Sequence, residues 1–164
     1  MIGYLSEKGI HVTDKGPFDF VADDDYPEWI SKTAEEVSRD PENACGIVIG
    51  MSGQGEAMVA NKFKNVRAGV YYGSPAVAHA GDAGRSAETE NLNGSNSDGS
   101  VRSGDEIIRL LREHNDSNIL ALGARFVSIP EAQAAIELWL ETAFSEDKRH
   151  IRRIDKIHEI EDRT

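Results

Sequence analysis

The segment from Gly46 to Lys62 constrains the fold more than any other part of this 164-residue chain. Its apolar run at 47–49 has the length and the β-branched content of a buried strand. A turn with glycines at positions 50, 53 and 55 follows, and the residues from Glu56 onward resemble the start of a helix. This order predicts an α/β unit whose turn lies at the end of a strand.

The glycine turn is suited to binding negative charge. Glycines let backbone N–H groups approach a ligand closely, and a helix N-terminus favours an anion. A phosphate, a carboxylate or an enediolate-like oxyanion would fit, although many α/β proteins carry such glycines only for tight packing. Ser52 adds a hydroxyl inside the turn, and Glu56 adds a carboxylate where the helix begins. A Glu at this position also stabilises the helix dipole alone, so both a catalytic and a structural role stay open.

Hydrophobic periodicity predicts the remaining elements. We expect helices at 2–8, 28–38, from 56, 105–113, 131–143 and from Asp147, and strands at 10–12, 46–49, 67–72 and 119–122. Strands that alternate with helices imply a parallel sheet covered on both faces. We therefore predict one Rossmann-like, three-layer α/β/α domain over residues 1–164.

The segment 81–104 differs from the rest. Gly, Ser and Asn dominate it, and Leu92 and Val101 are its only large aliphatic residues. Such a segment buries too little apolar surface to offset the entropy lost on ordering. We expect a flexible polar insertion on the surface and assign it no chemistry.

Composition argues against several classes of protein. The net charge is −11, from 29 acidic and 18 basic residues, which argues against a nucleic-acid partner. No apolar stretch approaches the ~20 residues that cross a bilayer, so we expect no membrane partner. The single cysteine, Cys45, excludes an intrachain disulfide and suits the reducing cytoplasm. No metal-ligand spacing such as HExxH or CxxC is present, and we assign the acidic run 23–25 to a turn.

Short motifs in order resemble the ribose-5-phosphate isomerase type B family, which includes galactose-6-phosphate isomerase subunits. Besides the glycine turn, the matching runs are Ala-Asp-Asp-Asp-Tyr-Pro at 22–27, Ala-Asn-Lys at 60–62, Val-Arg-Ala at 66–68, Arg-Glu-His-Asn at 112–115, Leu-Gly-Ala-Arg at 122–125 and Arg-His-Ile-Arg-Arg at 149–153. Together they span most of the chain apart from the insertion.

The resemblance implies an aldose–ketose isomerase that interconverts ribose 5-phosphate and ribulose 5-phosphate through an enediolate, without metal or organic cofactor. Family members carry either a Cys base, at the position of Gly50 here, or a Glu base, at the position of Glu56. This chain therefore resembles the Glu branch, with His114 as proton donor for ring opening and Asn115 as a sugar ligand. The remaining substrate-binding residues of the turn would be Met51, Ser52, Gly53, Gln54 and Gly55.

Arg149 and Arg153 are four residues apart and share a helix face, where two guanidinium groups could grip a phosphate. A solvated basic face is the alternative. Arg125 is a third candidate anion ligand, and His150 lies off the arginine face without an assigned role. Because family members are dimers, or dimers of dimers, whose sites combine two subunits, we expect a homodimer or a dimer of dimers that binds a sugar phosphate.

The chain departs from the family at its start. Family members open with a strand and a Gly-x-Asp-His-like turn, whereas Met1 stands where the first helix should be finishing. We therefore expect a sheet without its first strand, in either a fragment or a rearranged variant. Two alternatives follow: an isomerase of another aldose phosphate, such as galactose or allose 6-phosphate, or a truncated, catalytically silent paralogue that binds sugar phosphate.

Overall fold

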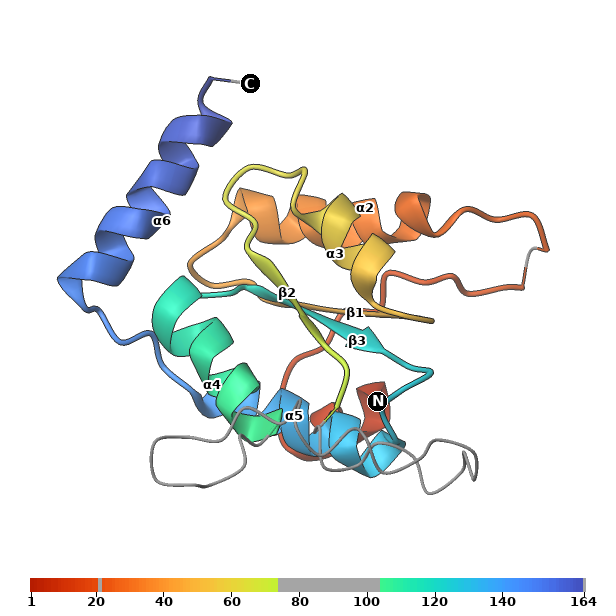
Figure 1. Ribbon diagram of the computed structural model, residues 1–164. Coiled ribbons are helices and arrows are strands. Elements are labelled where there is room, and N and C mark those ends of the chain that lie inside the picture. Colours follow the sequence, from red (N-terminus) through yellow and green to blue (C-terminus); the bar gives the residue numbers. More distant parts are fainter. Residues whose placement is uncertain (21, 74–103, 164) are drawn as a thin grey trace, which may run out of the picture.

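The computed structural model describes residues 1–20, 22–73 and 104–163 (Figure 1). The expected insertion at 81–104 lies outside these ranges except for its last residue. The described helices are α1 (Ile2–Glu7), α2 (Tyr26–Arg39), α3 (Gln54–Ala60), α4 (Gly104–Asn115), α5 (Ile129–Glu141) and α6 (Lys148–Glu161). The described strands are β1 (Gly46–Gly50), β2 (Ala68–Tyr71) and β3 (Ile119–Gly123).

The three strands form one parallel sheet in the order β1-β3-β2. β3 pairs with β1 from Gly46↔Ile119 to Gly50↔Gly123, and with β2 from Ala68↔Ile119 to Tyr71↔Leu122. All three strands therefore end at the same edge of the sheet. In open α/β sheets this carboxyl edge is where ligands bind.

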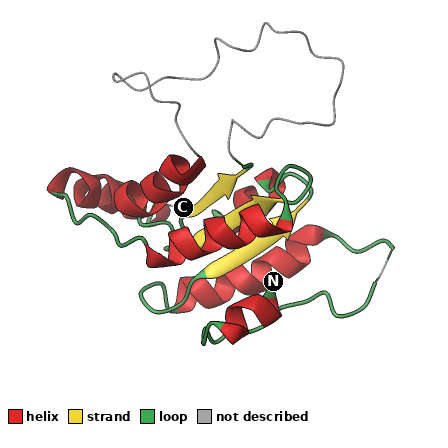
Figure 2. Ribbon diagram, turned by 90° about the horizontal axis from the view of Figure 1, so that it is seen from below, coloured by secondary structure: helices red, strands yellow, loops and turns green. Residues whose placement is uncertain are grey.

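β3 is the centre of the core, and its alternating side chains divide the core into two halves. Ile119 and Ala121 pack with buried residues of α2 and α3, whereas Leu120 and Leu122 pack with those of α1, α4 and α5. Helices cover both faces of the sheet, as Figures 1 and 2 show. The structure confirms the predicted Rossmann-like three-layer arrangement.

One predicted element is wrong. Residues 10–12 do not form a strand, and Ile10 is 36% exposed. A strand requires backbone partners, and in the described ranges β1 pairs with β3 alone. Residues 10–12 therefore have the apolar pattern of a strand, but in the described ranges no neighbouring strand forms backbone hydrogen bonds with them.

Helix α6 stands beside the body (Figure 1), and hydrogen bonds join it to the body at both of its ends. Its first turn meets the end of α4, where His150 approaches a carbonyl of that helix. Its last turn meets the loop before β2, where Lys64 Nζ lies 2.5 Å from Asp162 Oδ1. Isoleucines of α6 stay partly open to solvent, with Ile151 41% and Ile157 42% exposed. No helix in the described part of the chain is both long and apolar enough to cross a membrane.

Candidate active site

The glycine turn joins β1 to α3 at the carboxyl edge of the sheet (Figure 1). Gly53 takes the N-cap of α3 with a φ of 74°, a left-handed conformation that glycine adopts without strain. A β-carbon on Gly53 would lie 3.1 Å from the backbone of Leu122 and Gly123, so the turn packs directly on the end of β3. Backbone hydrogen bonds of 2.8 and 3.1 Å from the N–H groups of 124–125 to the carbonyls of 50–51 fix this contact.

The predicted substrate-binding residues of the turn lie together. Met51 is 70% exposed, and the Ser52 hydroxyl accepts a hydrogen bond from the Gln54 N–H at 3.3 Å. A β-carbon on Gly55 would lie 2.6 Å from the Tyr26 hydroxyl, so this phenol lies against the turn. The sequence placed Tyr26 only within a motif, because nothing in the spacing indicates that the start of α2 reaches the turn.

Glu56 folds back from the first turn of α3 toward the end of β1. A β-carbon on Gly50 would lie 1.6 Å from Glu56 Oε1, so the carboxylate fills the space beside this glycine. Glu56 is 8% exposed, and no described residue makes a hydrogen bond or ion pair with its carboxylate. The site thus contains a buried carboxylate, a hydroxyl and the free N–H groups of a helix start, which together could accept a proton and stabilise an oxyanion.

A second group of predicted residues lies around the end of α4. The rings of His114 and His150 are 4.1 Å apart between centroids, with an interplanar angle of 46°. Asn115 is exposed, and its side-chain amide donates to Leu110 O at 3.2 Å. The structure therefore places His114 against α6, while the side chain of Asn115 makes a hydrogen bond within α4.

His150 is buried, with 2% of its surface exposed. Its Nδ1 lies 3.2 Å from Glu113 O and 3.0 Å from Ser145 Oγ, and its Nε2 lies 3.1 Å from Arg149 Nε. Both ring nitrogens therefore have partners. The sequence left His150 without a role, since helical spacing turns it away from the face of Arg149 and Arg153.

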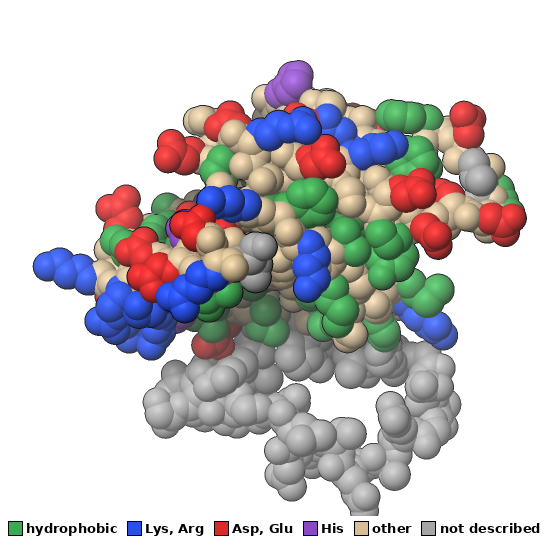
Figure 3. All heavy atoms as spheres, turned by 90° about the horizontal axis from the view of Figure 1, so that it is seen from above, with side chains coloured by type: hydrophobic (Ala, Val, Ile, Leu, Met, Phe, Trp, Pro, Cys, Tyr) green, Lys and Arg blue, Asp and Glu red, His purple; other side chains and the backbone are tan. Residues whose placement is uncertain are grey.

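Basic side chains gather over the first half of α6, as Figure 3 shows at one end of the molecule. Asp147 caps this helix by accepting from the Arg149 N–H at 2.9 Å, and its carboxylate also lies 3.3 Å from Arg149 Nε. The hydrogen bond from the Arg149 N–H lowers the pKa of Asp147, against the opposing effect of desolvation, and the charges of Arg149, His150 and Arg153 lower it further. In the described ranges, no hydrogen bond reaches the terminal nitrogens of Arg149 or the side chain of Arg153, so both can bind an anion.

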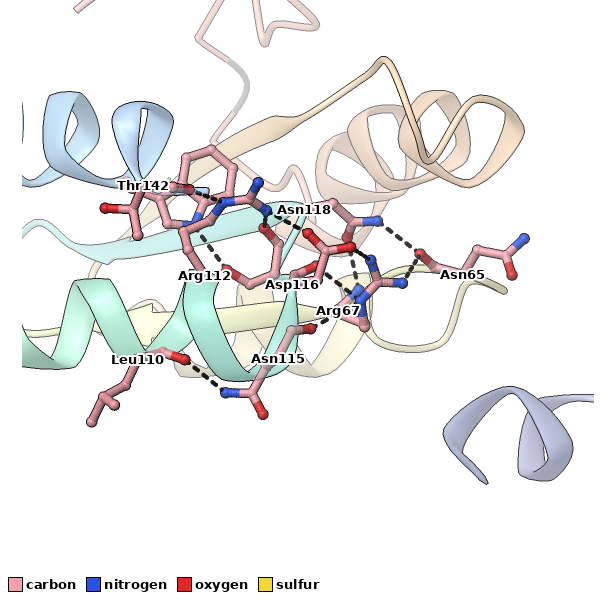
Figure 4. A network of polar contacts seen from close by, with 10 residues as sticks. Asn65, Arg67, Leu110, Arg112, Asn115, Asp116, Asn118 and Thr142 are labelled. Atoms are coloured by element: carbon pink, nitrogen blue, oxygen red, sulfur yellow. Dashed lines mark hydrogen bonds and ion pairs between the residues drawn. The ribbon is translucent and has the colours of Figure 1, made fainter. Parts of the chain in front are cut away.

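Two other motif arginines hold the end of α4 (Figure 4). Arg67 Nε donates to the carbonyls of Asn115 at 3.0 Å and Asp116 at 2.9 Å, and its Nη2 lies 2.7 Å from Asp116 Oδ2. Arg112 Nη1 lies 3.1 Å from Asp116 Oδ1. These contacts satisfy carbonyls at a helix C-terminus, where positive charge is favourable. Arg67 and Arg112 therefore position the segment that carries His114.

The predicted site residues of one chain fall into two clusters at opposite edges of the sheet (Figure 1). Glu56, the glycine turn and the exposed Arg125 lie where the strands end, whereas His114 precedes the start of β3 together with Arg149. The five residues of β3 separate these edges by about 13 Å at ~3.3 Å per residue. Arg125 and Arg149 are both predicted anion ligands, but Arg125 lies in the Glu56 cluster and Arg149 in the His114 cluster.

Two hollows, of about 660 and 850 Å³, flank α6. Neither includes the glycine turn, and Asn115 is the only predicted site residue that lines either. We attribute them to the space between α6 and the body. In the acidic run, Asp24 accepts from Trp29 Nε1 at 3.1 Å, and no group of His, Cys, Asp and Glu in the described ranges could hold a metal ion.

The parallel sheet, with a carboxylate-bearing glycine turn at its carboxyl edge, defines a Rossmann-like α/β protein with a site at the end of a strand. The family described as Ribose/Galactose Isomerase matches residues 1–88 and 101–157. The chain belongs to this family.

Individual relatives agree with the family match. Ribose-5-phosphate isomerase B of Mycolicibacterium paratuberculosis is 31% identical over 161 residues, which cover 98% of this chain and 81% of the relative. The Escherichia coli protein of the same name is 30% identical over 163 residues, covering 99% and 87%.

Solved structures of such enzymes share the fold. The Mycoplasma genitalium ribose-5-phosphate isomerase B, crystallised with bound ribulose-5-phosphate, has a TM-score of 0.76 and 30% identity, and the match covers 99% of this chain and 86% of that one. The Clostridium thermocellum enzyme has a TM-score of 0.74 and 31% identity, with the same coverage.

Proposed function

We propose that this protein interconverts ribose 5-phosphate and ribulose 5-phosphate, with Glu56 as the base. The observation that carries the proposal is the carboxylate of Glu56, held beside Gly50 in the glycine turn. Its relatives are ribose-5-phosphate isomerases, and one of them was crystallised with ribulose-5-phosphate. The whole chain serves as one isomerase domain, and its single cysteine suits the cytoplasm.

The chemistry transfers one proton between adjacent carbons. Glu56 takes the proton from C2 of the open-chain aldose, and the electrons of the C–H bond form the C1–C2 double bond of an enediolate. The proton then returns to C1, while the hydroxyl proton passes from O2 to O1, which yields the ketose. Ser52 and the N–H groups of Gly53 and Gly55 stabilise the negative oxygen. His114 donates a proton to the ring oxygen when the sugar opens.

Two copies of the chain complete each site. A sugar phosphate gripped by Arg149 and Arg153 lies at the amino edge of the sheet, beyond the reach of Glu56 in the same chain. We therefore pair the Glu56 cluster of one copy, which includes Arg125, with the His114 cluster of a second copy, which includes Asn115. A homodimer with two-fold symmetry provides two such sites, and a dimer of dimers provides four.

A direct assay with three substrates tests the proposed function. The purified chain should convert ribose 5-phosphate to ribulose 5-phosphate with a higher kcat/KM than galactose 6-phosphate or allose 6-phosphate. Preferred turnover of a six-carbon substrate would assign the protein to another aldose phosphate. If no sugar phosphate were isomerised while ribose 5-phosphate still bound, the protein would be a silent binder.

A further inference from the structure

We propose that His150 is a positioning residue that orients the guanidinium of Arg149 toward the substrate phosphate and supports the ring of His114. This inference rests on the proposed function, in which Arg149 binds phosphate and His114 donates a proton. His150 is buried and lies between the two, whereas Arg149 is exposed.

The contacts of His150 define its tautomer. Arg149 Nε carries a hydrogen and can only donate, so His150 Nε2, 3.1 Å away, must accept. Nδ1 then carries the ring hydrogen, which points toward Glu113 O at 3.2 Å and Ser145 Oγ at 3.0 Å. The Ser145 hydroxyl also accepts from the Asp147 N–H at 3.4 Å. The neutral Nδ1–H form of His150 satisfies every one of these contacts.

These contacts hold the guanidinium of Arg149 at Nε and leave its two terminal nitrogens available to bind an anion. The Nε–H lies between His150 Nε2 and Asp147 Oδ2, at 3.1 and 3.3 Å. With Nε held on both sides, the two terminal nitrogens remain as a fork, the geometry that binds phosphate oxygens in pairs. The same imidazole packs on His114 at 4.1 Å, so one side chain sets the position of both groups.

Two substitutions separate these roles. His150→Phe keeps a ring against His114 but removes the acceptor for Arg149, so KM for ribose 5-phosphate and the inhibition constant of inorganic phosphate should rise about tenfold, with little change in kcat. His150→Gln keeps an acceptor near the position of Nε2 but removes the ring, so kcat should fall while KM stays near that of the wild type. Arg152→Gln, on an exposed position of the same helix, is the control and should change neither.

A double-mutant cycle tests whether His150 acts through Arg149. In an Arg149→Ala background, His150→Phe should raise KM no further, because the group that it orients is gone. An undiminished tenfold effect in that background would overturn the proposal. The proposal would also be overturned if both His150 variants showed the same fall in kcat together with the same rise in KM. That result would indicate a purely structural role in holding α6 on α4.

Two readouts are independent of turnover. In ¹⁵N spectra of the wild-type protein, His150 should show a protonated Nδ1 and an unprotonated Nε2, and the opposite tautomer would contradict the proposal. Inorganic phosphate should bind the wild type about tenfold more tightly than His150→Phe in calorimetry, and equal affinity would contradict it. If the wild type failed to isomerise ribose 5-phosphate while both readouts held, the proposed function would fail and the role of His150 in anion binding would stand.

Discussion

The carboxylate of Glu56 occupies the space that a side chain on Gly50 would need. A β-carbon on Gly50 would lie 1.6 Å from Glu56 Oε1 and 2.1 Å from its Cδ, far inside any tolerated contact. The absence of a side chain at 50 therefore allows a carboxylate to sit at the end of β1. The family resemblance implies a Cys base at this position in other members, and such a side chain at residue 50 would overlap the Glu56 carboxylate as it lies here.

Gly50→Ala should abolish most of the activity although the mutated residue has no side chain of its own. The new methyl group displaces the flexible end of Glu56. Turnover of ribose 5-phosphate should therefore fall by about 10²-fold or more, which is the rate enhancement that a positioned base usually provides. Circular dichroism should stay unchanged because the carboxylate can move. Gly3→Ala is the matched control, since nothing lies within 4 Å of a β-carbon there. Full activity of Gly50→Ala would show that the position of the Glu56 carboxylate beside residue 50 does not matter for catalysis.

Glu56→Gln should reduce turnover by about 10²–10⁴-fold and leave sugar-phosphate binding nearly intact, because the amide keeps the shape but cannot accept the proton. Exchange of the C2 hydrogen with deuterated solvent, followed by NMR, should disappear together with turnover. Wild-type exchange in this variant would mean that another group is the base.

Cys45→Ser should leave turnover unchanged. Cys45 precedes β1 and lies outside the turn. Although the residue is exposed, partial desolvation of its thiol raises the pKa, against the opposing charge of Arg112. A thiol with a raised pKa is a poor nucleophile, so thiol-blocking reagents should also have little effect on the rate. Strong inactivation by either treatment would show that the chain uses thiol chemistry.

Much of the fold follows from local pattern. The predicted strand at 119–122 and the predicted helices at 105–113 and 131–143 agree with the structure within two residues, because their apolar spacing agrees with their burial. The strand at 10–12 failed because strand formation depends on a partner, which local pattern does not reveal. Family resemblance, rather than periodicity, singled out Glu56 and His114.

The packing around His150 could not be read from the sequence. Helical spacing put Arg149 and Arg153 on one face and turned His150 away, yet α6 meets the end of α4 on the side of His150. That contact depends on how distant segments pack. The separation of Glu56 from His114, in contrast, follows from the parallel direction of the strands, because Glu56 comes after β1 and His114 before β3.

Alkaline pH should destabilise the protein through Tyr71. Burial, followed by the charges of Glu131 and Asp105, raises the pKa of Tyr71 to about 12. The folded protein therefore keeps the phenolic proton after the unfolded chain has lost it, so the stability that Tyr71 contributes is complete below its ordinary pKa and declines as the pH rises toward about 12. Urea unfolding from about pH 9 to about pH 12 should show a steeper decline for the wild type than for Tyr71→Phe. Parallel curves would contradict this assignment.

The central claim, that each site combines Glu56 of one copy with His114 of another, is tested most directly by mixing two inactive variants. Glu56→Gln and His114→Asn should each lose most of their activity alone. After unfolding and refolding together, half of the dimers should contain one chain of each kind, and one of the two sites in such a dimer is wild type at both positions. Activity should therefore recover to about a quarter of the wild-type value for a two-fold dimer. If both residues served a site within one chain, every site in the mixture would carry a substitution, and no recovery above the separate variants would contradict the account.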